Sequence, residues 1–127
     1  MRNSRSQVMG QVMNLDASQA AVFWPIYKQF EADSTKWGDR MLSLVKTYTE
    51  NYDQMTNDLA DQLATELLAL DQQRTEVKRQ YYEKFKKALD PITAARFLQV
   101  ENQLEHVMAL QVASQLPVMR SSQGGTQ

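Results

Sequence analysis

Apolar and aromatic residues recur every three or four positions between Leu15 and Met55, which predicts one long amphipathic helix. The apolar stripe of this helix consists of Phe23, Tyr27, Phe30, Trp37, Met41, Leu44, Tyr48 and Met55. A helix of this length would reach roughly 57 Å, whereas a compact domain of this chain length is only about 30 Å across. The helix therefore needs neighbours of similar length, either other helices of the chain or a second copy of itself.

Capping residues mark where the long helix begins. Asp16 is a favoured N-cap, and Gln19 stands where its side chain would reach back to complete a capping box. Pro25 lies inside the helix, and its missing N–H and its crowded ring predict a kink near residues 21–25. Ahead of the cap, the spacing of apolar residues predicts only a short helix over residues 7–13, with frayed residues before it.

A second long helix is expected after a break around residues 53–57. Thr56 is its N-cap, and the helix runs to about Ala88. Its apolar stripe consists of Leu59, Leu63, Leu67, Leu70, Val77, Tyr81, Phe85 and Leu89. Acidic residues gather in its first half and basic residues in its second half, which suits the helix dipole.

Asp90 and Pro91 begin the third long helix, because proline is favoured at the first helical position. Pro117 ends it, and its apolar residues lie on more than one face, so we expect it to be the most buried of the three. The sequence thus predicts an all-α fold in which one short and three long helices form extended antiparallel hairpins. A single helical domain would cover residues 1–117, and residues 118–127 would form a disordered tail.

The composition supplies few of the side chains that catalysis or metal binding requires. The chain has 127 residues, no cysteine, one histidine and a formal net charge of −1. Disulfides and thiolate chemistry are therefore excluded, and the sequence shows no nucleophile–base pair and no phosphate-binding glycine loop. No apolar run approaches the ~20 residues of a membrane span. We expect no enzymatic activity, no cofactor and no membrane insertion.

Three groups of residues invite a functional hypothesis, and each has a simpler structural explanation. His106 has no well-placed partner ligand, because the adjacent Glu105 would point about 100° away on a helix, so we expect no metal site. The seven methionines lie on predicted core positions or in weakly ordered ends. The basic and aromatic block over residues 78–87 fits the helix dipole better than nucleic-acid binding, which we do not expect.

An aromatic cluster near the start of the long helix is the candidate contact surface. Phe23, Tyr27 and Phe30 share one stripe, Trp24 widens it, and Trp37 follows on the same helix. Burial would contribute on the order of 2–3 kcal/mol for each ring, so a tight core is the first explanation. If the face is open, these five residues would bind unfolded polypeptides or partner proteins.

Two helix starts carry related motifs. Residues 15–19 read Leu-Asp-Ala-Ser-Gln, and residues 89–93 read Leu-Asp-Pro-Ile-Thr. With one short helix ahead of three long ones, this order resembles the Spy/CpxP family of bacterial periplasmic proteins, which carry a repeated Leu-Thr-x-x-Gln motif. In the first copy Leu15 and Gln19 match the motif. In the second copy only Leu89 matches, and aspartate replaces threonine in both.

The resemblance implies a periplasmic, non-enzymatic protein that forms a homodimer from paired hairpins. Such a protein would hold unfolded clients without ATP, as a chaperone, or would modulate an envelope-stress sensor. A cytoplasmic location stays open, because the sequence shows no leader segment. Two other functions also stay open, namely a structural helical module that only oligomerises and a metal-responsive sensor.

Overall fold

The computed structural model describes the backbone of residues 2–119 and the side chains from Arg5 to Met119, and this part of the chain is all-helical. Its elements are α1 (Arg2–Met13), α2 (Ala17–Glu50), the 3₁₀ turn η1 (Tyr52–Gln54), α3 (Asn57–Ala88) and α4 (Pro91–Ala113). The predicted all-α fold of one short and three long helices is therefore confirmed.

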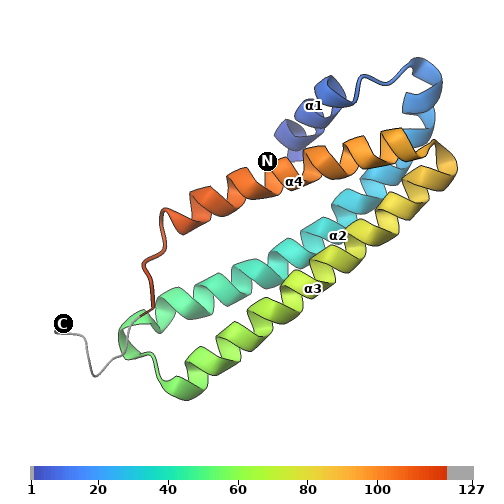
Figure 1. Ribbon diagram of the computed structural model, residues 1–127. Coiled ribbons are helices and arrows are strands. Elements are labelled where there is room, and N and C mark those ends of the chain that lie inside the picture. Colours follow the sequence, from blue (N-terminus) through green and yellow to red (C-terminus); the bar gives the residue numbers. More distant parts are fainter. Residues whose placement is uncertain (1, 120–127) are drawn as a thin grey trace.

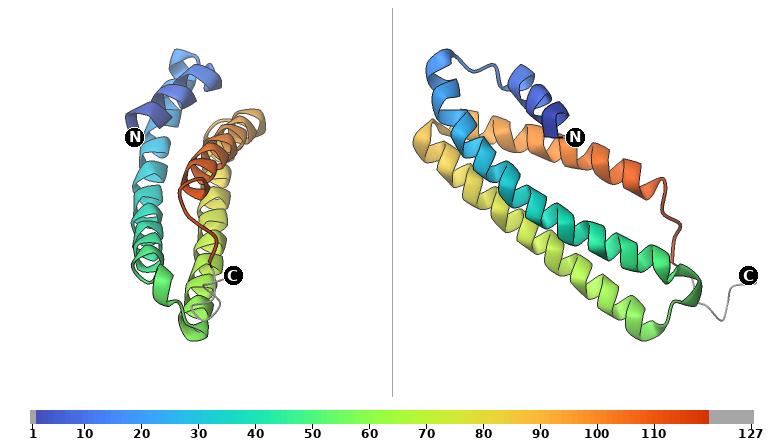
Figure 2. Two further views of the ribbon diagram at one scale, coloured as in Figure 1. Left: turned by 90° about the vertical axis from the view of Figure 1, so that its left-hand side faces the viewer. Right: turned by 180° about the vertical axis from the view of Figure 1, so that it is seen from behind.

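The two longest helices, α2 and α3, form an antiparallel hairpin and run side by side (Figure 1). α4 packs against the second half of α3, and α1 packs on α4 (Figure 2). The 32-residue α3 thus supplies the long neighbour that the 34-residue α2 needs. The length of α2 by itself no longer calls for a second copy, and the homodimer stays a prediction.

Each long helix begins with the predicted capping residue. The Gln19 N–H donates to the Asp16 carboxylate at 2.8 Å, and the Asp16 N–H donates to the Gln19 side chain at 3.2 Å, so the capping box is confirmed. Thr56 caps α3 by accepting from the Leu59 N–H at 3.1 Å. Asp90 caps α4, and the hydrogen bonds that its carboxylate accepts at Thr93 hold the pKa of Asp90 below its usual range.

The Asp16 cap gives a test of this local stabilisation. Asp16→Ala is expected to lower the free energy of unfolding by about 1 kcal/mol, because the amides of the first turn lose their side-chain acceptor. Urea unfolding followed by circular dichroism measures the change. Asp39→Ala, at an exposed position in the middle of α2, is the control and is expected to change the value by less than about 0.5 kcal/mol. Equal losses for the two variants would contradict the capping role.

Several helix boundaries differ from the predicted ones. α2 ends at Glu50 and is followed by η1, so the helix does not continue to Met55. α1 begins at Arg2 rather than at Gln7, because the Arg5 side chain pairs with Glu101 and ties this turn to α4. α4 ends at Ala113, ahead of the predicted stop at Pro117.

The proline inside α2 does not interrupt the helix. The helix stays continuous through Pro25, and Figure 2 shows that its first turns bend away from the axis of the rest. This bend agrees with the predicted kink, which follows from the missing N–H and the crowded ring. The bend carries the start of α2 toward α1.

Two separate hydrophobic clusters hold the helices together. The larger lies where α1, α2, α3 and α4 meet and consists of Met9, Met13, Phe23, Tyr27, Phe30, Tyr81, Phe85, Ala94, Phe97 and Val100. The smaller lies farther along the hairpin and consists of Leu44, Met55, Leu63 and Leu70. Met9 and Met13 are fully buried, so the expectation that they belong to a weakly ordered end is wrong.

The described part of the chain contains no helix with the length and apolarity that crossing a membrane requires.

Candidate functional site

The predicted aromatic contact surface lies mostly in the interior. Phe23 is fully buried, and Tyr27 and Phe30 are each only 1% exposed. The Phe23 ring stacks on Phe85 with centroids 4.7 Å apart, and the Phe30 ring meets Phe97 edge-on at 5.1 Å. The core explanation therefore holds for these three rings, because a partner could reach them only if the helices separated.

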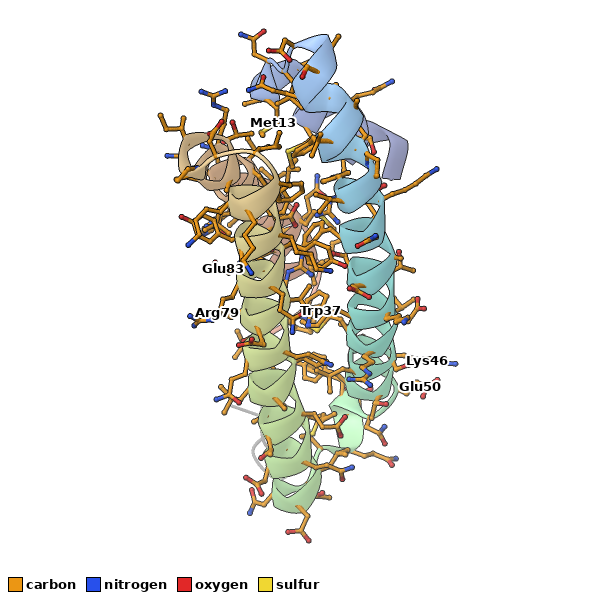
Figure 3. The ribbon with its side chains drawn as sticks, turned by 90° about the vertical axis from the view of Figure 1, so that its right-hand side faces the viewer. Met13, Trp37, Lys46, Glu50, Arg79 and Glu83 are labelled. Atoms are coloured by element: carbon orange, nitrogen blue, oxygen red, sulfur yellow. The ribbon has the colours of Figure 1, made fainter. Side chains whose placement is uncertain are left out.

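The two tryptophans lie apart from each other and are half-buried. Trp24 contacts the Phe23 ring edge-on at 5.0 Å and packs near Gly10 of α1. Trp37 lies between α2 and α3 (Figure 3), where its Nε1–H donates to the Leu70 carbonyl at 2.7 Å. The five predicted residues therefore do not make one open face, which corrects that expectation. Their part in binding a client stays a prediction.

An apolar groove lies instead near the end of the hairpin that carries η1, and it has a volume of about 480 Å³. The wall from the hairpin consists of Met41, Leu44, Val45, Tyr48, Leu63, Ala64 and Leu67. The opposite wall comes from the end of α4 and the segment after it, and consists of Val112, Ala113, Leu116, Pro117, Val118 and Met119. We call this space the hairpin groove.

The hairpin groove exists because α4 does not follow the hairpin to its end. Figures 1 and 2 show α4 standing off from α2 and α3 toward its C-terminal end. Leu67 belongs to the same helical stripe as Leu63 and Leu70, but it is 38% exposed whereas they are buried. The apolar stripe of α3 is therefore longer than the cover that the other helices provide.

Residues 114–119, which we call the strap, cross from the end of α4 to the end of α2 (Figure 1). The Tyr48 hydroxyl donates to the Pro117 carbonyl at 2.5 Å, and the Tyr52 hydroxyl donates to the Val118 carbonyl at 3.0 Å. Burial, and to a lesser degree Tyr52, raises the pKa of the Tyr48 phenol, so this donor keeps its proton. The predicted disordered tail over residues 118–127 stays a prediction, because only residues 118 and 119 of it are described and residues 120–127 lie outside the described residues.

Exposed apolar side chains lie on several faces of the second half of α4, which ends at the hairpin groove. Val107, Met108, Leu110 and Val112 are 54%, 47%, 71% and 48% exposed. The expectation that the last helix is the most buried is therefore wrong for its second half. Only its first half, with Phe97 and Val100, enters the core. Of these four side chains only Val112 lines the hairpin groove.

The same end of the molecule is acidic. Residues 47–73 contain no lysine, arginine or histidine and carry six carboxylates, which are Glu50, Asp53, Asp58, Asp61, Glu66 and Asp71. All six are exposed, and none forms an ion pair with another described residue. Figure 3 shows the nearby Lys46 pointing outward from α2. The hairpin groove therefore lies in a negative electrostatic field.

A buried ionic network lies near the middle of α3 and α4, where α1 meets them. Glu101 is fully buried and pairs with Arg5 of α1 and with Arg74 of α3, the latter at 3.3 Å. Arg74 and Lys78 also pair with Glu105 at 2.8 and 3.0 Å. Burial raises the pKa of the Glu101 carboxyl, although the two guanidinium groups oppose this. The network fixes α1 against the bundle, and each of its charges has a partner in the chain.

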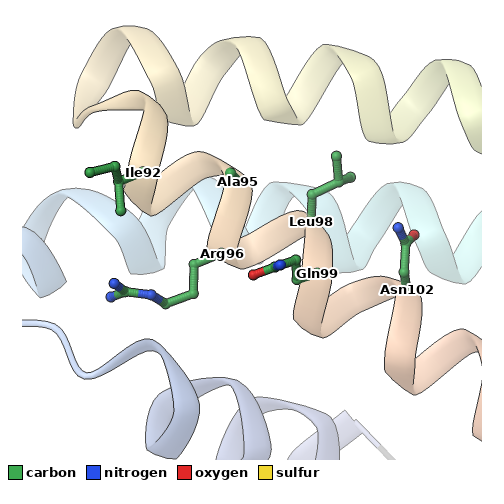
Figure 4. A pocket seen from close by; sticks show the side chains of 6 residues that line it. All are labelled: Ile92, Ala95, Arg96, Leu98, Gln99 and Asn102. Carbon is green, nitrogen blue, oxygen red and sulfur yellow. The ribbon is translucent and has the colours of Figure 1, made fainter.

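A second hollow, of about 440 Å³, lies on the outer face of α4. Figure 4 shows its side chains, all from α4, with Arg96 extending toward the segment after α1. The Arg96 guanidinium donates to the Met13 carbonyl at 3.0 Å, so this residue already has a structural role. A hollow built from one helix surrounds a ligand poorly, so we favour the hairpin groove as the candidate site.

No family model, curated protein or solved structure matches this chain. The resemblance to the Spy/CpxP family therefore stays a prediction from element order and short motifs.

The described residues contain no group of three or more metal-ligating side chains. His106 is exposed, and its Nδ1 lies 2.8 Å from the Asn102 carbonyl oxygen within the same helix. The metal-responsive alternative thus gains no support from the geometry around the single histidine.

Sequence reasoning did not identify the hairpin groove. Two signals in the sequence point to it once the fold is known. One is the apolar pattern on more than one face of residues 104–112, and the other is the absence of basic residues over residues 47–73. The apolar pattern by itself predicts burial, because a sequence pattern does not show where a neighbouring helix ends.

Proposed function

We propose that this protein is a non-enzymatic binding protein that holds exposed apolar segments of other polypeptides without ATP, as a client-holding chaperone does. The observation that carries the proposal is the hairpin groove, together with the exposed apolar side chains on the second half of α4. Grooves lined by apolar side chains with a few placed polar groups are the usual binding sites of proteins. Here Tyr48 supplies such a polar group.

In this proposal the contact surface lies at the end of the hairpin that carries η1, and not at the aromatic cluster. The large rings near Phe23 stabilise the bundle, and smaller aliphatic and methionine side chains offer the surface. Methionine suits a surface that accepts different sequences, because its side chain is flexible and polarisable. Met41, Met108 and Met119 lie in or beside the hairpin groove. A periplasmic location and the modulation of an envelope-stress sensor belong to the family resemblance and remain predictions.

A second candidate function is oligomerisation through the same exposed side chains of α4. Val107 and Leu110 are more than half exposed on α4, and a self-associating helical module would bury such residues. The two functions differ in what happens to the exposed apolar surface when the protein concentration rises. A module that only oligomerises would lose its exposed apolar surface on assembly and would not bind an unfolded client.

The test is the suppression of aggregation of a reduced, unfolded lysozyme, measured by light scattering. We expect the purified protein to suppress scattering at a near-stoichiometric ratio, and to bind a dye that reports exposed apolar surface. An inert globular protein at equal mass is the control. The proposal fails if scattering is unchanged at a several-fold excess and the dye does not bind. Sedimentation of the protein alone then shows whether the oligomerisation candidate applies.

A further inference from the structure

The strap is a poor occupant of the hairpin groove. Val118 is 87% exposed, so this apolar side chain of the strap makes little use of the groove. An open groove of about 480 Å³ lies between the strap and the hairpin. A segment that filled the groove with its side chains would bury more of the apolar wall than the strap does. The strap therefore buries the apolar wall of the hairpin only in part.

The polar contacts that hold the strap do not select its sequence. The Tyr48 and Tyr52 hydroxyls donate to the carbonyl oxygens of Pro117 and Val118. A backbone carbonyl is present in every extended peptide, so another segment can accept the same hydrogen bonds. This is the usual division in peptide recognition, in which backbone contacts give affinity and side-chain pockets give specificity.

The charge around the hairpin groove indicates which extended segments fit. Six exposed carboxylates and no basic residue lie within residues 47–73. The strap itself continues in the sequence from Leu-Pro-Val-Met directly into Arg120. In the sequence, therefore, the apolar stretch of the strap is followed directly by a basic residue. Charge complementarity of this kind favours basic partners and disfavours acidic ones.

We propose that the hairpin groove binds an extended apolar segment of another polypeptide with basic residues beside it, and that the strap is the resident competitor for this site. The proposal rests on the proposed function and names its binding site and the class of segment it accepts. An incoming segment takes the hydrogen bonds of the two tyrosines and packs on the hairpin wall around Leu67. The strap is displaced in the same step.

Competition by the strap sets the expected size of the effect. The apparent dissociation constant of an external peptide is its intrinsic value divided by the fraction of molecules with the strap displaced. If the strap covers the site about nine-tenths of the time, loosening it tightens external binding on the order of tenfold. Leu116→Ser combined with Met119→Ser removes two of the four apolar side chains of the strap and leaves the hairpin unchanged.

The probe is a fluorescein-labelled synthetic peptide with the sequence of residues 114–123, titrated against the full-length chain and followed by fluorescence anisotropy. We expect the strap variant to bind it on the order of tenfold more tightly than the wild type. In the strap variant, Leu67→Glu is expected to weaken binding at least tenfold. Leu68→Glu is the matched control, because Leu68 is the next residue, is 65% exposed and does not line the groove.

A second peptide, with Arg120→Glu, tests the charge. We expect it to bind on the order of tenfold more weakly than the basic peptide at low salt, with the difference shrinking as salt screens the carboxylates. Equal affinities of the two peptides would overturn the charge preference. Equal affinities of the wild type and the strap variant would overturn the competition, and equal losses for Leu67→Glu and Leu68→Glu would overturn the site. Circular dichroism melts confirm that each variant is folded.

The lysozyme assay separates this inference from the proposed function. If the wild type suppresses aggregation and Leu67→Glu suppresses it equally well, client holding stands and the hairpin groove is not the site. If the peptide binds as expected and the wild type does not suppress aggregation, the groove stands as a peptide site and client holding fails.

Discussion

Replacing Phe97 with alanine is expected to lower the free energy of unfolding by about 3–5 kcal/mol. Phe97 is fully buried, and its ring centroid lies 4.6 Å from that of Phe85, 5.1 Å from that of Phe30 and 6.3 Å from that of Tyr27. These partners come from α2 and α3, so the ring of α4 joins three helices. Its loss leaves a cavity that rigid neighbours fill only in part.

Urea unfolding followed by circular dichroism measures this loss. Ile92→Ala is the control, because Ile92 lies on the same helix but is 72% exposed. We expect the control to change the free energy of unfolding by less than about 0.5 kcal/mol. A loss of less than about 1 kcal/mol for Phe97→Ala would mean that this aromatic cluster is not the main core.

Glu101→Ala is the second substitution with a large expected effect, a loss of about 3–5 kcal/mol. The substitution leaves the guanidinium of Arg5 and part of that of Arg74 without their carboxylate, and both side chains are more than four-fifths buried. An unpaired buried charge costs more than the pair that it belonged to. We also expect α1 to detach first, because Arg5 is its ionic link to α4.

The control for Glu101→Ala is Glu83→Ala. Glu83 pairs with Lys86 at 3.1 Å, but both side chains are well exposed. An exposed pair contributes about 0–1 kcal/mol, so the two glutamates should differ by several-fold in their effect. Hydrogen exchange of α1 amides then reports detachment of this helix. Unchanged exchange in Glu101→Ala would contradict the proposed ionic link.

The pH dependence of stability tests the environment of Glu101 separately. Burial raises the pKa of this carboxyl in the folded chain above its value in the unfolded chain. The folded state therefore binds the proton more tightly. The contribution of Glu101 is fully present below the unfolded pKa and is lost as the pH rises through the folded pKa.

Glu101→Gln removes this titration and keeps the volume of the side chain. We therefore expect the free energy of unfolding of the wild type, relative to Glu101→Gln, to fall as the pH rises above the ordinary glutamate pKa of about 4.3. Urea titrations of both proteins across this range measure the difference. A difference that rises with pH would show that the two arginines outweigh burial.

Local features of the fold could be predicted from the sequence, because they depend on neighbouring residues. Asp16, Thr56 and Asp90 cap the helices as their positions predict, since a cap needs only its own first turn. The stripe with Phe23 and Phe30 is buried, because spacing alone places these side chains on one face. Predicting these caps and this buried face requires no knowledge of contacts between residues that are distant in sequence.

Features that depend on contacts distant in sequence could not be predicted in this way. Glu101 is fully buried because Arg5 and Arg74 meet it from α1 and α3, and nothing in its local sequence distinguishes it from a surface glutamate. Leu67 continues a stripe that predicts burial, yet it is exposed because α4 leaves the hairpin. The candidate site arises from this mismatch between the lengths of packed helices.

The charge segregation along α3 gives this helix an acidic first half and a basic second half, which the net charge of −1 conceals. The six carboxylates over residues 47–73 lie near the η1 end. Over residues 74–87, six basic residues, namely Arg74, Lys78, Arg79, Lys84, Lys86 and Lys87, outnumber two acids. A cationic partner that approaches in solution would be attracted toward the acidic half of α3 before it makes contact. Encounter rates, and not only final affinities, would therefore fall with added salt.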